Sequence, residues 1–222
     1  MATHSPRIAF LHTGAVVIPP VAELTASLIP DATVVNYLDD KIVADLSDPA
    51  RADSVPERVT DLVRAAKRGG ADLVMLTCSS ISYLAEPAAT EVGIPVLRID
   101  EAVADNAVAT GNRIAVLATL PTTLHPTTNL LKERAQVAGR EPEFISEVID
   151  GAFAAVAGGD RTTHDRLVAE AIERAAEQAD VIVLAQASMA SAAEAAHVTV
   201  PVLTSIAPGI ARLREAVNAL PA

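Results

Sequence analysis

The chain has 222 residues, half of them hydrophobic, and carries a formal net charge of −11 at pH 7. This acidic balance disfavours nucleic acid and anionic membrane surfaces as partners, because both repel a negatively charged protein. No apolar run approaches the roughly 20 residues that a membrane-spanning helix needs. The sequence also contains no Walker loop, zinc-type cluster or G-x-G-x-x-G fingerprint, so we expect no metal site.

Aromatic residues are scarce, with two Tyr, three Phe and no Trp, so the core must be built from aliphatic side chains. Such packing suits a parallel sheet covered by helices. The single cysteine cannot form an intramolecular disulfide, and the N-terminus shows no signal-peptide pattern. Both features favour a cytoplasmic location.

Apolar runs alternate with amphipathic stretches along the first half of the chain, which is typical of an α/β protein. We predict strands at residues 7–12, 33–38, 73–76 and 93–97. We predict helices at residues 19–28, 55–68 and 101–110, the last of them capped by Asp100.

The strand at residues 73–76 leads directly into Thr77, Cys78 and two serines. We expect Ser79 or Ser80 to cap a following helix, with Cys78 at the helix N-terminus and at the carboxyl edge of the sheet. Helix N-terminal amides favour an anion or a thiolate at such a position. The alternative is a small buried cysteine with a packing role only.

The second half of the chain repeats the first. Arg113-Ile-Ala-Val-Leu-Ala-Thr119 matches a segment that starts at Arg7, and Ala179-Asp-Val-Ile-Val-Leu184 matches one that starts at Ala71. Val200-Pro-Val-Leu203 matches Ile94-Pro-Val-Leu97, and the three offsets are 106, 108 and 106 residues. Matching segments in one order at nearly one spacing indicate two related halves.

We therefore predict an α/β fold of two pseudo-symmetric halves, each with a mainly parallel four-stranded sheet flanked by helices. Residues 1–97 with 208–222 should form the first half, and residues 98–207 the second. We expect the active site between the halves, where the carboxyl ends of equivalent strands would face each other. The offset of 108 makes Gln186 the counterpart of Cys78.

These residues carry a resemblance to the aspartate/glutamate/hydantoin racemase superfamily over essentially the whole chain. Leu76-Thr-Cys-Ser-Ser80 is similar to the family's first cysteine motif. His12-Thr13-Gly14 stands where the family has a catalytic loop, and Thr119 with Pro121-Thr-Thr123 resembles its carboxylate-binding loop. The resemblance implies a small carboxylate substrate, no cofactor, and two cysteines that flank the carbon whose proton is exchanged.

The chain departs from this pattern at the second cysteine. Where the family usually has Leu-Gly-Cys-Thr, this chain has Leu184-Ala-Gln-Ala-Ser188. An amide cannot take or deliver a proton at neutral pH, so symmetric two-thiol racemisation is not expected. Relatives with one cysteine include one-sided epimerases and arylmalonate decarboxylase, which keeps the second-half cysteine where this chain keeps the first.

Cys78 is the candidate acid/base, because a thiol pKa can be lowered to suit proton abstraction next to a carboxylate. His12 is a second catalytic candidate, with a structural role as the alternative. His164, like His4 and His197, is expected on a terminus or a polar helix surface without a role. The predicted substrate-binding residues are Thr13, Gly14, Ser79, Ser80, Thr119, Thr122, Thr123, Gln186, Ala187 and Ser188, although Thr122 and Thr123 could serve only as helix caps.

Three functions remain open from the sequence. The first is a cofactor-independent racemase or isomerase acting on a small carboxylate or amino acid through Cys78. The second is a decarboxylase or carbon–carbon lyase, in which one thiol suffices, and the third is a binding protein on a degenerate racemase scaffold. A homo-oligomer, dimer or higher, is the expected assembly.

Overall fold

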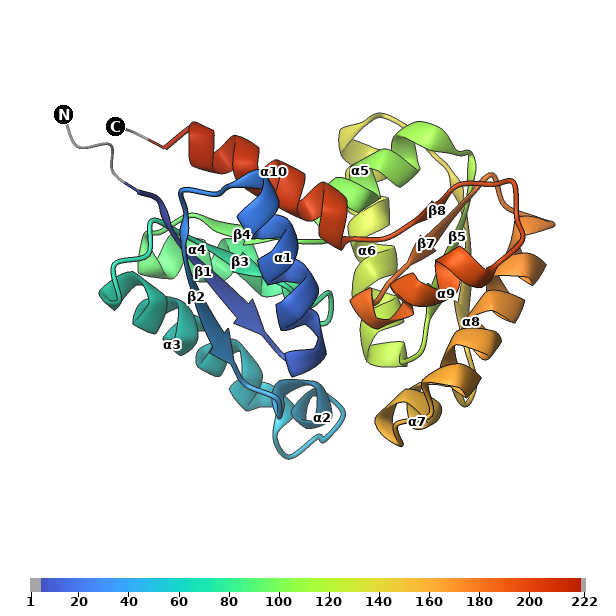
Figure 1. Ribbon diagram of the computed structural model, residues 1–222, viewed down its shortest axis with the longest axis horizontal. Helices are drawn as coiled ribbons and strands as arrows, with labels where there is room; N and C mark the ends of the chain where they lie inside the picture. The colour runs from blue at the N-terminus through green and yellow to red at the C-terminus, as the bar shows by residue number, and fades with distance from the viewer. Residues whose placement is uncertain (1–4, 221–222) are drawn as a thin grey trace. The chain divides into compact units, whose positions relative to one another are not determined.

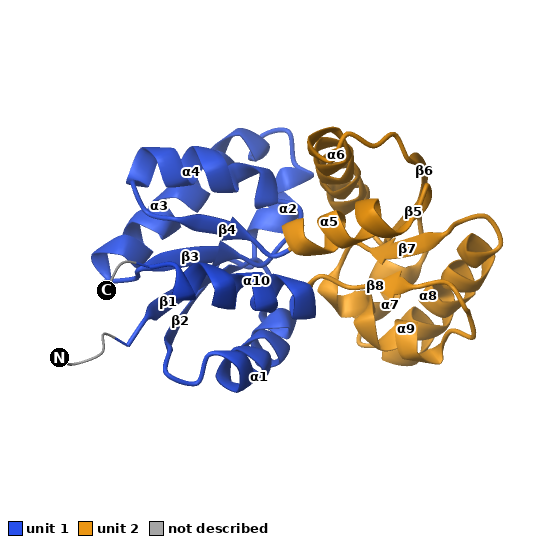
Figure 2. Cartoon of the chain, turned by 90° about the horizontal axis from the view of Figure 1, so that it is seen from above, with its two compact units in different colours: residues 1–99, 206–222 blue, residues 100–205 orange. Residues whose placement is uncertain are grey.

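The structure, a computed structural model, describes residues 5–220. The chain divides into two compact units (Figures 1 and 2). Unit 1 comprises residues 1–99 and 206–222, and unit 2 comprises residues 100–205. The chain therefore leaves unit 1 after Ile99 and returns to it at Ile206, so that the C-terminal helix belongs to the N-terminal unit.

Unit 1 alternates strands and helices. Its strands are β1 (Arg7–His12), β2 (Thr33–Leu38), β3 (Leu73–Leu76) and β4 (Val96–Arg98). Its α-helices are α1 (Ile18–Leu28), α2 (Ile42–Leu46), α3 (Val55–Arg68), α4 (Ala85–Val92) and α10 (Ile206–Asn218). Three short 3₁₀ turns are η1 (Ala15–Val17), η2 (Ala52–Ser54) and η3 (Ser82–Leu84).

Unit 2 follows the same pattern. Its strands are β5 (Arg113–Ala118), β6 (Glu143–Val148), β7 (Val181–Leu184) and β8 (Val202–Leu203). Its helices are α5 (Glu101–Thr110), α6 (Pro121–Val137), α7 (Ala152–Ala157), α8 (Arg161–Ala176) and α9 (Ala190–Ala195), with a 3₁₀ turn η4 (Ala187–Met189).

Each unit contains a four-stranded sheet, in the order β2-β1-β3-β4 in unit 1 and β6-β5-β7-β8 in unit 2. Every neighbouring pair of strands in both sheets is parallel. The predicted α/β fold class with two four-stranded sheets is confirmed. The repeated sequence segments therefore form equivalent strands in two sheets with the same strand order.

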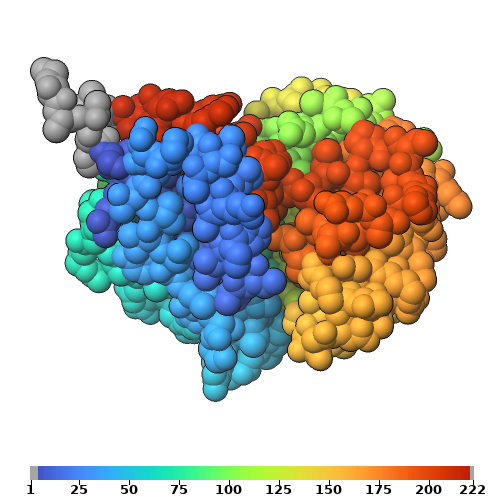
Figure 3. All heavy atoms as spheres, in the orientation of Figure 1, coloured from blue at the N-terminus to red at the C-terminus, as the bar shows by residue number. Residues whose placement is uncertain are grey.

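Helices cover both faces of the unit 1 sheet, as Figure 2 shows. Ala9, Leu11, Val74 and Leu76 point into one cluster together with residues of α3 and α4. Helices α1 and α10 pack against each other on the opposite face (Figures 1 and 3). Since β3 is buried on both faces, an uninterrupted apolar run is the sequence that fits it.

Unit 2 has two separate apolar layers. Helices α5 and α6 share one cluster with β5 and β7, and α7, α8 and α9 share another with the opposite faces of the same strands. Each unit therefore has its own hydrophobic core. In unit 2, the loops that follow β5 and β7 are held in place by these two strands, which are buried on both faces.

The helix after Cys78 begins later than predicted. The chain makes a turn in which the Ile81 amide donates to Cys78 O (3.2 Å), continues through η3, and only then enters α4. The N-cap of α4 is Leu84, without a side-chain capping bond, so the expected capping by Ser79 or Ser80 was wrong. Ile81 is completely buried in the core, and its burial favours a turn at this point over an immediate helix.

Two smaller predictions also need correction. The strand predicted at residues 93–97 is Val96–Arg98, because Gly93 adopts a left-handed conformation that ends α4. Asp100 occupies the N-cap position of α5, but its side chain makes no capping hydrogen bond.

Candidate functional site

The carboxyl edge of the unit 1 sheet gathers the first group of predicted site residues. Strands β1 and β3 are parallel neighbours with Leu11 opposite Leu76, so His12, the last residue of β1, lies beside Thr77, the first residue after β3, and Cys78 follows Thr77. Cys78 is a partly buried thiol that packs against the cluster under α3 and α4. Thr77, Ser79 and Ser80 are all buried around it.

His12 is completely buried and both of its ring nitrogens lie near protein oxygens. Nδ1 is 2.8 Å from Thr77 Oγ1, and Nε2 is 2.8 Å from Asn36 Oδ1. Burial lowers the pKa of His12, while the hydrogen bond to Asn36 opposes this shift. A neutral ring donates from one nitrogen only. Since Asn36 Oδ1 can only accept, Nε2 donates to it. The single hydrogen of the Thr77 hydroxyl is shared between His12 Nδ1 and Leu11 O, which lies 3.1 Å from Thr77 Oγ1.

His12 and Cys78 lie on different faces of the sheet. His12 stacks on Phe10, with ring centroids 6.0 Å apart, whereas Cys78 packs on the side of Leu11 and Leu76. Alternate residues of a strand point to opposite faces. This geometry favours a structural role for His12, in which it orients Thr77, and its catalytic role stays a prediction.

The loop after β1 leaves open space at this edge. Thr13 is buried, whereas Gly14 is partly exposed with extended backbone. A Cβ placed on Gly14 would meet no atom within 4 Å, apart from its chain neighbours. A small ligand could therefore approach the Gly14 backbone closely.

The loop that carries Cys78 has a partner that the sequence analysis missed. Arg98, the last residue of β4, donates from Nη2 to Ser82 Oγ (3.4 Å), and Ser82 Oγ donates to Ser79 O (3.2 Å). The sequence feature that could have indicated a site residue is the position of Arg98 directly after Pro95-Val-Leu97, at the carboxyl end of a predicted strand. A guanidinium therefore reaches the Cys78 loop.

Acidic residues at the same edge are paired within unit 1. Asp39 follows β2, and Arg58 from α3 donates to it from Nε at 3.1 Å. Arg58 also pairs with Asp45 of α2, which lowers the pKa of that carboxyl group. This pairing reduces the negative potential that an anionic ligand would meet near β2.

At the carboxyl edge of the unit 2 sheet, Gln186 is joined to Thr119. The backbone amide of Thr119 donates to Gln186 Oε1 (2.6 Å), and Gln186 Nε2 donates to Thr119 Oγ1 (2.8 Å). The two residues follow β7 and β5, which are neighbouring strands. We call this reciprocal pair the Gln186–Thr119 clip. It commits both polar atoms of the Gln186 side chain to Thr119.

Thr122 and Thr123 lie in the first turn of α6, whose N-cap is Leu120 without a side-chain capping bond. Neither threonine is thus the N-cap residue. The Thr122 hydroxyl is buried and has no hydrogen-bond partner among residues 5–220. Thr123 is buried as well.

Ala187 and Ser188 lie in the turn η4, and Arg161 of α8 forms hydrogen bonds to this segment. Arg161 Nη2 donates to Ser188 O at 2.7 Å and to Ser191 Oγ at 2.6 Å. His164 is completely buried beside this contact, with Nδ1 2.7 Å from Asp165 Oδ1. The prediction that His164 lies on a polar helix surface was therefore wrong, because its ring faces the core side of α8.

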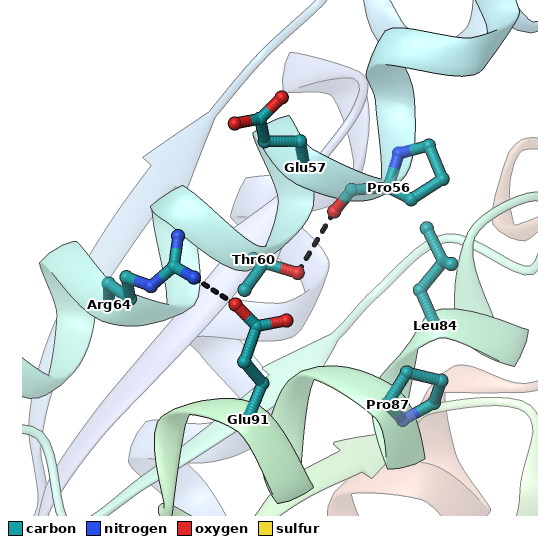
Figure 4. A pocket seen from close by; sticks show the side chains of 7 residues that line it. All are labelled: Pro56, Glu57, Thr60, Arg64, Leu84, Pro87 and Glu91. Carbon is teal, nitrogen blue, oxygen red and sulfur yellow. Dashed lines mark hydrogen bonds and ion pairs between the residues drawn. The ribbon is translucent and has the colours of Figure 1, made fainter.

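A surface groove of about 320 Å³ lies between α3 and α4 in unit 1 (Figure 4). In the groove, Arg64 pairs with Glu91, and the Thr60 hydroxyl donates to Pro56 O at 2.9 Å. The lining residues include no thiol or histidine. The groove therefore does not contain Cys78, and we do not assign the reaction to it.

Within residues 5–220, no group of three or more His, Cys, Asp or Glu side chains is arranged to hold a metal ion. In the same part of the chain, no helix combines the length and the apolar character needed to cross a membrane.

The family assignment comes from the sequence as a whole. The family model described as Asp/Glu/Hydantoin racemase matches residues 12–213, from the end of β1 to within α10. The chain belongs to the Asp/Glu/hydantoin racemase family. No curated protein matches the chain.

Solved structures of racemases and a decarboxylase share this fold. A glutamate racemase isoform from Bacillus anthracis superposes with a TM-score of 0.78 at 16% identity, covering 97% of this chain and 83% of that one. Aspartate racemase from Picrophilus torridus gives 0.70 at 14% identity, covering 96% and 94%. Unliganded arylmalonate decarboxylase gives 0.57 at 20% identity, covering 98% and 94%.

Proposed function

We propose that this protein is a cofactor-independent isomerase that racemises or epimerises a small carboxylate, with Cys78 as the acid/base. The observation that carries the proposal is a partly buried thiol, the chain's single cysteine, directly after the central strand β3 and among buried hydroxyl residues. Membership of the racemase family supports the same reaction class.

The proposed chemistry needs a base and a group of donors. The Cys78 thiolate takes the proton from the alpha carbon, and the electron pair delocalises into the carboxylate. Return of that proton by the thiol keeps the configuration, so inversion takes a proton from solvent on the opposite face. Hydroxyl and backbone donors of Thr13, Ser79 and Ser80 are the proposed partners of the enolate oxygens. The open space at Gly14 supports access of a small substrate to these groups.

A decarboxylase or carbon–carbon lyase is the second candidate, and the Gln186–Thr119 clip is the observation that favours it. The clipped amide cannot carry a proton, so a second acid/base is not available from Gln186. In a decarboxylation, the bond to the leaving carbon dioxide breaks, its electron pair stays on the alpha carbon, and one thiol delivers the proton.

Deuterium incorporation distinguishes these candidates. The protein is incubated in D₂O with amino acids, 2-hydroxy acids, 2-aryl acids and disubstituted malonates, and products are followed by NMR, chiral chromatography and carbon dioxide release. Alpha-deuterium without carbon dioxide release supports the isomerase, and stoichiometric release with one deuterium per product supports the decarboxylase. Tight binding of a carboxylate without exchange or release would contradict both and indicate a binding protein.

The stereochemistry of exchange is a further readout. Because Gln186 offers no proton, we expect exchange in the wild type to favour one enantiomer or one prochiral face. Equal exchange rates for both enantiomers would contradict the one-thiol chemistry.

A further inference from the structure

Arg98 lies beside the loop that carries the thiol. It is the last residue of β4 and stands opposite Leu76 in the parallel register. Val96 and Cys78 both pack against the cluster that contains Leu76, and alternate residues of a strand share a face. Arg98 therefore points to the face on which Cys78 packs, a placement that its contact with Ser82 bears out.

Two hydrogen bonds join Arg98 to the carbonyl of Ser79, the residue after Cys78. Arg98 Nη2 donates to Ser82 Oγ at 3.4 Å, and Ser82 Oγ donates to Ser79 O at 3.2 Å. Ser82 is completely buried and Ser79 is almost so. Because water has little access to these groups, the contacts hold the turn in a fixed geometry.

Several charged and titratable groups of unit 1 around this loop are neutral, paired or peripheral, and Asp100, two residues after Arg98, is a buried carboxyl group outside this set. Burial lowers the pKa of His12 on β1 and raises the pKa of Tyr83 on η3, so both are neutral at pH 7. Arg58 on α3 is paired with two carboxylates, and Glu86 is exposed in the first turn of α4. Arg98 supplies a positive charge to the loop that carries Cys78.

We propose that Arg98 is a positioning residue for Cys78: through Ser82 it fixes the turn that carries the thiol, and its charge favours the thiolate. The catalytic meaning of this arrangement rests on the proposed function. The effect on the thiol itself does not, because a neighbouring cation stabilises a thiolate whatever the reaction.

Alkylation of Cys78 tests the proposal without any substrate. The chain has a single cysteine, so the pH dependence of its reaction with iodoacetamide reports this thiol alone. Arg98→Met should raise the midpoint of alkylation by about one pH unit, and Arg98→Gln, which retains a donor for Ser82 but no charge, should do the same. Ser82→Ala should shift the midpoint less and broaden the range of reaction rates, because the charge remains while the turn loosens.

Arg64→Met is the matched control. It removes one arginine from unit 1, but Arg64 pairs with Asp61 and Glu91 on the outer side of α3 and α4. We expect its alkylation midpoint to equal that of the wild type. Circular dichroism and thermal unfolding of each variant identify those that fold, and Arg98→Gln and Arg98→Lys provide folded alternatives if Arg98→Met does not fold. Arg98→Lys retains the charge and should restore the wild-type midpoint.

The alkylation results test the role of Arg98 independently of the proposed enzymatic function. An unchanged midpoint in folded Arg98→Gln and Arg98→Met would overturn the role of Arg98, even if the wild type exchanges alpha-protons. A raised midpoint that Arg98→Lys restores would support it, even if no carboxylate shows exchange. Where a substrate is found, kcat should fall at neutral pH in Arg98→Gln and recover in part as the pH is raised.

Discussion

At the residue scale, the structure separates the two acid/base candidates that the sequence placed together. His12 and Cys78 follow neighbouring strands, but their side chains pack on opposite faces of the sheet. The ring nitrogens of His12 are occupied by Thr77 and Asn36. The proposed chemistry therefore depends on Cys78, with His12 acting on the residue that precedes it.

Replacement of the thiol is the most direct test of that assignment. Cys78→Ala should retain the fold, because Cys78 is only partly buried and alanine fits the same space. Activity on a true substrate should fall by a factor of about 100 to 10,000, which is the usual contribution of a proton-transfer residue. Chiral chromatography measures the loss. Full activity in Cys78→Ser would contradict the assignment, since a serine hydroxyl is a far weaker acid.

His12 should make stability depend on pH. Burial lowers its pKa in the folded state, while the unfolded chain takes up the proton near pH 6.5. The unfolded state then binds more protons below about pH 6.5, so the free energy of unfolding should fall as the pH decreases from there. The slope is at most about 1.4 kcal/mol per pH unit.

Urea unfolding at pH 7.5 and 5.5 measures this effect. His12→Gln should lose the difference between the two pH values, whatever its absolute stability. His125→Gln is the control, because His125 is exposed on α6. An undiminished difference in His12→Gln would show that another group carries the pH dependence.

The Gln186–Thr119 clip should contribute to the stability of unit 2. Gln186→Ala leaves the buried Thr119 amide without its side-chain acceptor, and an unsatisfied buried donor costs about 1–3 kcal/mol. Thr119→Val removes only the second bond of the clip. A double-mutant cycle from urea unfolding should show a coupling above about 0.5 kcal/mol. Additive effects would mean that the two side chains act independently.

At the element scale, the C-terminal helix is fixed to unit 1 by close backbone contact. A Cβ on Gly209 of α10 would lie 2.5 Å from the carbonyl oxygen of Ile99. Only glycine fits at this position, because any Cβ would clash with the backbone of Ile99. Helix α10 therefore lies in close backbone contact with the segment that follows β4. Helix α10 also packs against α1 and buries Ile210 and Leu213.

Gly209→Ala should therefore destabilise unit 1, although alanine favours a helix. The clash is with backbone, which cannot rotate away, and overpacking of this kind costs about 1–3 kcal/mol. Thermal unfolding of Gly209→Ala measures the loss. Ala216→Gly serves as the control, because it lowers the helix propensity of α10 without creating a clash. Gly139→Ala is unsuitable as a control, because Gly139 has a positive φ that alanine rarely adopts. A Gly209→Ala protein more stable than the wild type would contradict the close packing.

At the scale of the whole molecule, the repeat in the sequence corresponds to two sheets with the same strand order, each with its own apolar core. The two units do not have the same residue at the position after the third strand. Unit 1 has a thiol after its third strand, and unit 2 has an amide clipped to the neighbouring strand. A dimer or higher homo-oligomer stays a prediction, which sedimentation would test.

The sequence by itself determined the fold class and the strands at Arg7–His12, Thr33–Leu38 and Leu73–Leu76. Apolar runs and their repetition are local signals, and a buried parallel strand leaves such a signal in the residues themselves. Only the tertiary structure decided the contacts of His12, Gln186 and Arg98, because a hydrogen bond to Thr77, Thr119 or Ser82 depends on which strands become neighbours. The helix after Cys78 likewise starts at Ala85 because Ile81 is buried in a core that residues distant in the sequence complete.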